Sequence, residues 1–381
     1  MLENSGALVW NNWKNAESIG QAHSTYEFRL YSDAHIIGER TYGPYTFINT
    51  VPHRSAVDRH EILPVIIVRV DWYGQPDNLD LTRTKKEGYH GGYFPDEIAA
   101  LVSLLAGIKI EAGPIDRTYH RDREGKIVNP FGRPLTHSHS FLPFKVGPTM
   151  KPRIPWLQKT FRLEKPSLLD TLPKLSTSVS TALITSARQF QKACWLSDTD
   201  PNTSWLLFVS ALEIAAQQWD STSDTVIDKL SESHPALTKM LRAKLDQEEL
   251  QRAAYELRKV TGATNKFLNF CLNYPVQPPE RRSTRCQISF EGSELRAALR
   301  KIYEHRSLAL HGGISFPFPI CIPPSSEGGD DEVPDEKPGG LGFGTNNYSW
   351  ASDECPMFLH TFAYIVRQTL LNWWADAVKS S

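Results

Sequence analysis

The chain has few cysteines and lacks long apolar runs. Its five cysteines are far apart and none forms a Cys-x-x-Cys pair, which excludes a disulfide framework and a zinc ribbon and favours a reducing compartment. They are Cys194, Cys271, Cys286, Cys321 and Cys355. No run of about 18 apolar residues is present, and the first residues lack the basic and apolar regions of a signal peptide. We therefore expect a cytoplasmic protein without membrane contact.

The chain also lacks an excess of either charge. It has 42 basic and 43 acidic residues in 381, a formal net charge of −1, so any contact with nucleic acid must depend on a local patch. It contains no phosphate-binding P-loop and no Gly-x-Ser-x-Gly nucleophile motif. The one close histidine pair, His137 and His139, has no acid or cysteine at ligand spacing. We predict neither a metal nor a cofactor.

Residues 1–165 are typical of a mixed α and β (α+β) domain. Residues 62–72 are apolar and β-branched, as in a strand. Residues 95–105 begin with Pro95 and two acids and are followed by Gly107, which predicts a helix and its end. Residues 108–112 form a second candidate strand, and residues 113–155, rich in proline, glycine and basic residues, are expected to be loop.

Residues 166–381 are predicted to form an all-α domain. A proline-rich stretch from Pro143 to Pro173 contains the expected boundary. The helical segments that the pattern predicts are 175–196, 203–219, 234–245, 247–273, 291–311 and 355–378. Residues 314–352 interrupt them with prolines, glycines and acids, so we expect a flexible acidic insertion there. Its acids are Glu327, Asp330, Asp331, Glu332, Asp335 and Glu336.

The most informative segment is the end of the helix predicted at 291–311. Arg306 falls on the apolar face of this helix, in line with Leu295, Leu299 and Ile302. A permanent charge on that face needs a partner or a function. His311 follows five positions later and precedes two glycines. On an ideal helix the two residues are about 140° apart around the axis and about 7.5 Å apart along it. One helix brings them together poorly, which favours a site shared by two copies.

These residues resemble a known family. Arg306 and His311 match the Arg-x4-His signature of HEPN domains, and residues 303–313 are similar to the Apea-like branch. Residues 205–216 resemble an earlier helix of that branch, with a comparable Ala-Leu-Glu. The resemblance covers about residues 170–378. It implies an HEPN-like helical bundle that dimerises, and in many members a metal-independent endoribonuclease of defence or toxin systems. Other members bind nucleic acid or partners without cutting.

The resemblance also implies roles for residues. His311 would carry a proton, since histidine exchanges protons near neutral pH, and Arg306 would bind phosphate oxygens. Ser307 stands where many active members have Asn, Asp or His, and it can still form hydrogen bonds. Tyr303 belongs to the matched segment and is expected to support the site. By spacing alone, a structural role explains both residues better: Arg306 would pair with a buried acid, and His311 would be favoured at the helix C-terminus by the dipole. With the resemblance added, the catalytic role is the better explanation.

Two sets of residues are expected to assist. Glu213, the single charged residue between Trp205 and Ala216, is predicted to pair with Arg306, although it could also face solvent or a backbone amide. A basic group around the motif is predicted to bind RNA, with a plain solvated surface as the alternative. Its members are Arg281, Arg282, Arg285, Arg300 and Lys301.

The sequence thus predicts an endoribonuclease that cleaves RNA by 2′-OH transesterification at a homodimeric site, in phage defence or a toxin-like stress response. The alternative is a non-catalytic dimer that binds RNA or protein. Residues 1–165 would select substrate, sense a trigger, or bind a regulatory protein or ligand.

Overall fold

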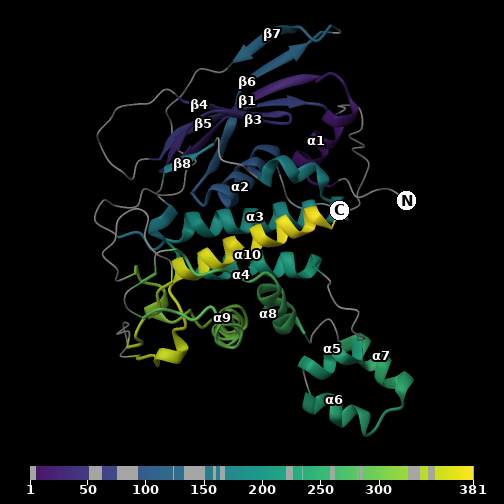
Figure 1. Ribbon diagram of the computed structural model, residues 1–381, viewed down its shortest axis with the longest axis vertical. Coiled ribbons are helices and arrows are strands. Elements are labelled where there is room, and N and C mark those ends of the chain that lie inside the picture. The colour runs from purple at the N-terminus through teal and green to yellow at the C-terminus, as the bar shows by residue number, and fades with distance from the viewer. Residues whose placement is uncertain are drawn as a thin grey trace.

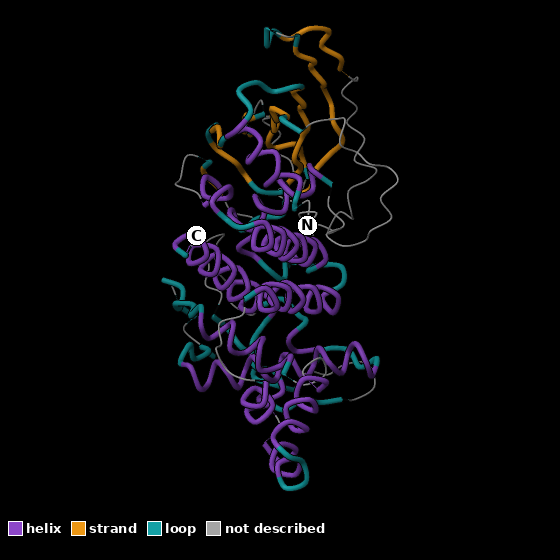
Figure 2. Tube along the Cα trace, turned by 90° about the vertical axis from the view of Figure 1, so that its right-hand side faces the viewer, coloured by secondary structure: helices purple, strands orange, loops and turns teal. Residues whose placement is uncertain are grey.

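The structure is a computed structural model of the whole chain. It describes residues 6–50, 62–74, 93–122, 124–132, 151–157, 160–163, 168–219, 226–233, 235–257, 262–280, 282–283, 286–324, 335–341 and 348–380. The molecule is elongated, with strands at one end and helices over the rest (Figures 1 and 2).

A six-stranded antiparallel sheet forms most of the N-terminal region, in the order β3-β4-β5-β1-β6-β7. Its strands are β1 (Ser24–Ser32), β3 (Arg40–Tyr42), β4 (Tyr45–Asn49), β5 (Leu63–Trp72), β6 (Glu111–Arg121) and β7 (Ile127–Gly132). A separate parallel pair joins β2 (His35–Ile37) to β8 (Thr160–Arg162). Strand β5 confirms the strand predicted at residues 62–72.

Helix α2 (Phe94–Ala106) covers one face of this sheet (Figure 1). Pro95 lies in its first turn, and Gly107 ends it with a φ of 65°, so the predicted helix and its end are confirmed. The ring of Phe94 lies 6.0 Å from that of Phe28 on β1 and 5.2 Å from that of Trp72 on β5. Helix α1 (Leu8–Ser18) packs beside α2.

The predictions for residues 108–155 are wrong in two respects. The strand expected at 108–112 begins only at Glu111. The loop expected at 113–155 contains most of β6 and all of β7, and the 3₁₀ helix η2 (Pro155–Leu157) begins at its last residue. Gly113 and Pro114 suggested a loop, but they lie at a register shift between β1 and β6, where a strand tolerates these residues. Pairing with β1 outweighs the local preference.

The chain after residue 168 is mostly helical, which confirms an α+β region followed by a helical one. Its α-helices are α3 (Thr177–Leu196), α4 (Pro201–Gln218), α5 (Val226–Ser233), α6 (Pro235–Arg242), α7 (Gln247–Leu257), α8 (Ala263–Asn273), α9 (Gly292–Gly312) and α10 (Leu359–Lys379). Short 3₁₀ helices are η3 (Leu168–Lys174), η4 (Phe318–Ile320) and η5 (Ser352–Glu354). Helices α3, α4, α9 and α10 correspond to predicted segments.

The single helix predicted at 247–273 is two helices, α7 and α8. Gly262, immediately before α8, has a φ of 100°, a conformation that favours glycine and does not continue a helix. Helix α5 was not predicted. Helices α5, α6 and α7 share a small apolar core that includes Leu230 and Leu250, and they lie at the end of the molecule farthest from the sheet (Figure 1).

The sheet region and the helical region share one continuous core across the boundary predicted at 165/166. The Lys109 ammonium, after α2, lies 2.7 Å from the Asp198 carboxylate, after α3. The Trp195 indole donates to the carbonyl of Ile110 at 3.1 Å. Arg367 of α10 donates to the carbonyl of Leu104 at 2.8 Å, near the end of α2. These contacts join the predicted domains into one packed body.

Some of the described residues between 314 and 352 pack against the helical region. The ring of Phe316 stacks on Trp205 of α4, with centroids 5.5 Å apart and planes 13° apart. Asp335 is fully buried and accepts from Arg282 at 2.6 Å. The expectation of a flexible insertion is therefore wrong for Phe316 and Asp335, which are buried. The acids at 327, 330, 331 and 332 lie outside the described residues.

Candidate functional site

Arg306 lies on the face of α9 that packs into the bundle. Leu295, Leu299 and Ile302, which precede it on this face, are buried. The Arg306 side chain itself is 20% exposed. The helical spacing that placed Arg306 on the apolar face is confirmed, since α9 is continuous from Gly292 to Gly312.

Glu213 of α4 is the partner of this arginine. The Nη2 of Arg306 donates to Glu213 Oε2 at 2.7 Å, which confirms the predicted pairing. The second carboxylate oxygen, Oε1, accepts from the hydroxyl of Tyr303 at 2.8 Å. One carboxylate thus holds a guanidinium and a phenol that lie one turn apart on α9. Both oxygens of a partly buried carboxylate are satisfied, as burial requires.

The environment keeps Tyr303 protonated. Burial raises the pKa of its phenol far above the ordinary value, and the negative charge of Glu213 and the hydrogen bond to it act in the same direction. The Arg306 guanidinium opposes them and lies 5.5 Å from the centre of the Tyr303 ring. The ring of Phe267 on α8 lies against that of Tyr303, with ring centroids 5.1 Å apart. Tyr303 is therefore a fixed hydrogen-bond donor to Glu213.

Some hydrogen-bond donors of the Arg306 guanidinium are not used. Of its five N–H groups, the contact with Glu213 uses one, on Nη2. The buried Nε finds no hydrogen-bond acceptor within the part of the chain that the structure describes. The Glu213 contact therefore orients the guanidinium without using all of its hydrogen-bond donors.

His311 lies in the last turn of α9, and its side chain is exposed. In the described ranges it forms no hydrogen bond or ion pair. Gly313 ends the helix with a φ of 64°, and its N–H donates to the carbonyl of Leu308. Because Arg306 and His311 belong to one straight helix, they point about 140° apart. A single chain does not bring them together.

Ser307 is half-buried, one turn before His311. No hydrogen bond joins the two among the described residues. His305, which the sequence argument passed over, is bound instead: its Nε2 lies 2.8 Å from the carbonyl oxygen of Glu354 in η5. Burial lowers the pKa of His305, the first of several causes. The position of His305 directly before Arg306 is the sequence feature that could have indicated a role for it. His305 attaches the segment before α10 to α9.

The predicted basic group does not form one free surface. The Nε of Arg282 donates to Asp335 at 2.6 Å, and its Nη2 donates to the carbonyl of Ile288 at 2.7 Å, so Arg282 supports the fold. Lys301 lies 2.8 Å from Glu304, and this hydrogen bond is the main cause of its raised pKa. Arg300 is exposed. Arg281 and Arg285 lie outside the described residues.

Apolar side chains are exposed around the end of α9. Leu308 and Leu310 lie between Arg306 and His311, and Ile314 and Phe318 follow the helix; each of the four residues is 46% to 56% exposed. Leu310 continues the apolar face one turn beyond Arg306, so the buried stripe of α9 extends onto the molecular surface. Leu308 lies about 160° from Leu310 around the axis, so Leu310 is the exposed leucine in line with this stripe. An exposed apolar side chain beside polar residues is typical of a protein interface.

Other site types find little support in the described residues. No group of three or more His, Cys, Asp or Glu side chains there could hold a metal ion, and the pair His137 and His139 lies outside them. The buried thiols of Cys321 and Cys355 have pKa values raised to about 12, chiefly by burial, which opposes nucleophilic use.

None of the described helices is both long and apolar enough to cross a bilayer. Comparisons with models of protein families, with curated proteins and with solved structures found no match to this chain.

Proposed function

We propose that this protein is a metal-independent endoribonuclease whose site combines Arg306 and His311 from two copies of α9. The single observation that carries the proposal is the arginine itself. It lies on a core-facing stripe and is oriented by Glu213 at 2.7 Å, yet it retains unused donors. An arginine needed only for packing could be replaced by an apolar residue at lower desolvation cost.

The chemistry is transesterification. The ribose 2′-OH attacks the adjacent phosphorus, the P–O5′ bond breaks, and the products carry a 2′,3′-cyclic phosphate and a 5′-OH. His311, exposed at the end of α9, would take the 2′-OH proton or supply one to the leaving oxygen. Arg306 would bind the phosphate oxygens as negative charge grows on them. Ser307, on the same side of the helix as His311, would contact the phosphate or the imidazole.

The proposed site is dimeric. Within one chain Arg306 and His311 diverge around the helix axis, whereas two antiparallel or crossed α9 helices can place one residue of each kind beside a shared phosphate. The exposed side chain of Leu310, one turn beyond Arg306 on the same face, supplies apolar area for such a contact at the position where it is needed. Phage defence or a toxin-like stress response is the proposed setting.

A non-catalytic dimer that binds RNA or protein is the second candidate. The observation that favours it is charge compensation: Glu213 pairs with Arg306 and reduces the positive charge available to a phosphate. Ser307 also forms no hydrogen bond to His311 among the described residues.

The test is incubation of the purified full chain with total RNA in excess EDTA, followed by analysis of fragment ends. We expect fragments with 2′,3′-cyclic phosphate from the wild type and none from His311→Ala, which should fold normally because His311 is exposed. His305→Ala is the matched control, since it removes a neighbouring histidine of α9 and should retain cleavage. Intact RNA with dimeric wild type would favour the second candidate. Equal cleavage by wild type and His311→Ala would contradict the proposal.

A further inference from the structure

A row of polar side chains crosses the face of the sheet that α2 does not cover. On β1, Phe28 points toward α2, and Glu27 points to the opposite face. Glu27 is in register with Arg69 of β5 on one side and with Arg117 of β6 on the other. The row continues from Arg69 to Thr46 of β4 and from there to Thr41 of β3. Five strands at about 4.8 Å spacing make it about 19 Å long.

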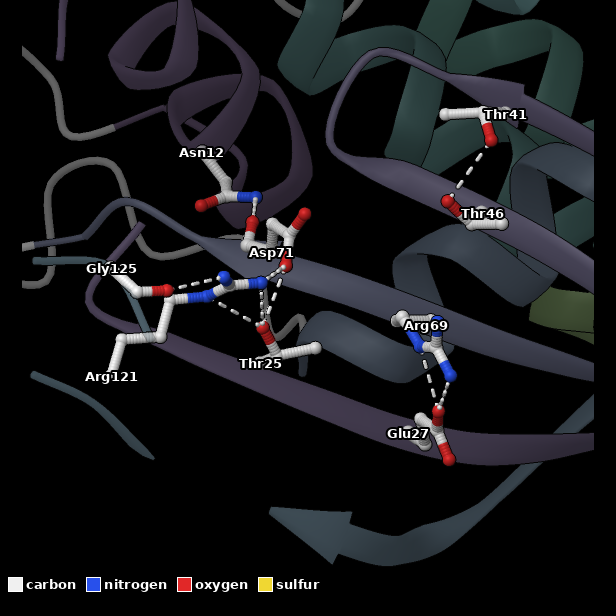
Figure 3. A network of polar contacts seen from close by, with 9 residues as sticks. All are labelled: Asn12, Thr25, Glu27, Thr41, Thr46, Arg69, Asp71, Arg121 and Gly125. Carbon is white, nitrogen blue, oxygen red and sulfur yellow. Dashed lines mark hydrogen bonds and ion pairs between the residues drawn. The ribbon is translucent and has the colours of Figure 1, made fainter. Parts of the chain in front are cut away.

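The centre of this row is a carboxylate shared by two arginines. The Nε of Arg69 donates to Glu27 Oε1 at 2.8 Å, and its Nη2 lies 2.7 Å from the same oxygen (Figure 3). The Nη2 of Arg117 contacts the other oxygen, Oε2. The Glu27 side chain is 1% exposed, whereas those of Arg69 and Arg117 are 46% and 50% exposed. The buried acid fixes two guanidinium groups whose outer edges face solvent.

This arrangement leaves one uncompensated positive charge. Nearby arginines on the same face each have a carboxylate of their own: Arg29 forms two hydrogen bonds to Asp116, and Arg121 pairs with Asp71 at 3.0 Å (Figure 3). Arg69 and Arg117 share Glu27 alone among the described residues. Two cations around one anion give a net charge of +1 at the centre of the row.

The chemistry of the row suits phosphate groups. Guanidinium groups present paired N–H donors that match phosphate oxygens, and the hydroxyls of Thr41 and Thr46, 3.1 Å apart (Figure 3), add further donors. Arg117 lies over the ring of Tyr119 at 5.8 Å, and an aromatic ring beside a basic group can stack on an unpaired base. We propose that this face of the sheet binds the backbone of single-stranded RNA through Arg69 and Arg117.

The inference deepens the proposed function by giving the N-terminal region a substrate-binding surface separate from Arg306 and His311. It rests on that function for the choice of RNA as the ligand. The test therefore measures binding, in the full chain carrying His311→Ala, so that the absence of cleavage and the absence of binding are seen separately.

The probe is a fluorescein-labelled single-stranded RNA, and the readout is anisotropy over a range of salt concentrations. Replacing Arg69 and Arg117 by Gln should weaken binding about tenfold and, at about 0.7 per phosphate contact, reduce the salt slope of log K by about 1.4. The double variant leaves Glu27 buried without a cation and could therefore misfold. A triple variant with Glu27→Gln, Arg69→Gln and Arg117→Gln removes this unpaired charge and separates misfolding from lost binding. The control, Lys14→Gln with Arg252→Gln, removes two exposed, paired cations elsewhere.

We expect the double and triple variants to lose affinity and salt slope together, while the control retains both. A folded triple variant that binds RNA with unchanged affinity and slope would overturn the inference and make the two arginines counterions of Glu27 only. A His311→Ala parent that does not bind RNA would overturn it as well, whatever the outcome of the cleavage assay.

Discussion

The carboxylate of Glu213 and the guanidinium of Arg306 lie 2.7 Å apart, although 93 positions separate the two residues in the chain. Helices α4 and α9 pack against each other, and each supplies one charge to a partly buried pair whose side chains are 23% and 20% exposed. A pair shielded to this degree is less screened by solvent than a surface pair. It gives the site a fixed geometry.

We predict that Glu213→Ala lowers the free energy of unfolding by about 1–3 kcal/mol, because Arg306 and the Tyr303 hydroxyl both lose their acceptor. Glu213→Gln should cost less, since its amide oxygen still accepts. Urea unfolding measures both. Glu248→Gln, which removes an exposed carboxylate paired with Arg252, is the control and should change stability by less than about 0.5 kcal/mol. An unchanged midpoint for Glu213→Ala would contradict the prediction.

Tyr303→Phe keeps the ring beside Phe267 and removes the hydroxyl that donates to Glu213. We expect a loss of about 1 kcal/mol at neutral pH. Because the pKa of Tyr303 is raised in the folded state, the stability that its hydroxyl contributes is complete below the ordinary phenol pKa near 10 and falls above it. The difference between wild type and variant should therefore shrink above pH 10 in thermal unfolding. A constant difference would argue against a buried, protonated phenol.

Leu310→Asp should weaken self-association if the exposed Leu310 at the end of α9 lies in a dimer contact. A carboxylate at the centre of such a contact would be desolvated without a partner. Sedimentation velocity should show a dimer for wild type and a monomer for the variant at the same concentration. Met240→Asp, on the equally exposed surface of α6, is the control. A monomeric wild type would remove the dimeric site from the proposal.

We expect Glu111, at the start of β6, to make the free energy of unfolding depend on pH. Burial, followed by the charge of Asp96, raises its pKa from 4.5 to about 7, while Lys192 and Arg188 partly oppose this. A raised carboxyl pKa means that the folded state holds the proton more tightly. The contribution of Glu111 is thus most favourable below pH 4.5 and is lost as pH rises through 7.

Glu111→Gln mimics the protonated form, and we expect it to raise stability at pH 8 by about 1–3 kcal/mol and to change it little at pH 4. Thermal unfolding at the two pH values measures the difference. Glu17→Gln, an exposed acid of α1, should show no such dependence. Equal effects of Glu111→Gln at both pH values would contradict the raised pKa.

Lys109 and Asp198 join the sheet region to the helical region by a buried ion pair, with side chains 6% and 4% exposed. Lys109→Met leaves Asp198 buried without its cation and should cost about 3–5 kcal/mol. If the two regions form one cooperative unit, circular dichroism and tryptophan fluorescence should report the same lowered transition. Two separate transitions would show that the domains unfold independently.

Local periodicity predicted much of the fold. The helices near residues 175–196, 203–219 and 291–311 and the strand at 62–72 follow from apolar spacing and terminal residues alone. Strands β6 and β7 were missed because they lack a local alternation; β6 pairs with the distant strand β1, and β7 pairs with β6 at the edge of the sheet. The division between α7 and α8 was missed because an amphipathic pattern can continue across Gly262, whose φ of 100° ends regular helix geometry.

The sequence by itself determined that Arg306 lies on a buried face, that His311 lies on another side of the same helix, and that a charge on that face needs a partner. Those properties follow from the 3.6-residue repeat, which is local. Only the tertiary structure decided that Tyr303 shares Glu213, that Arg282 is held by Asp335, and that Glu27 is shared by two arginines. Contacts between elements depend on how helices and strands pack and on their register, which no local pattern specifies.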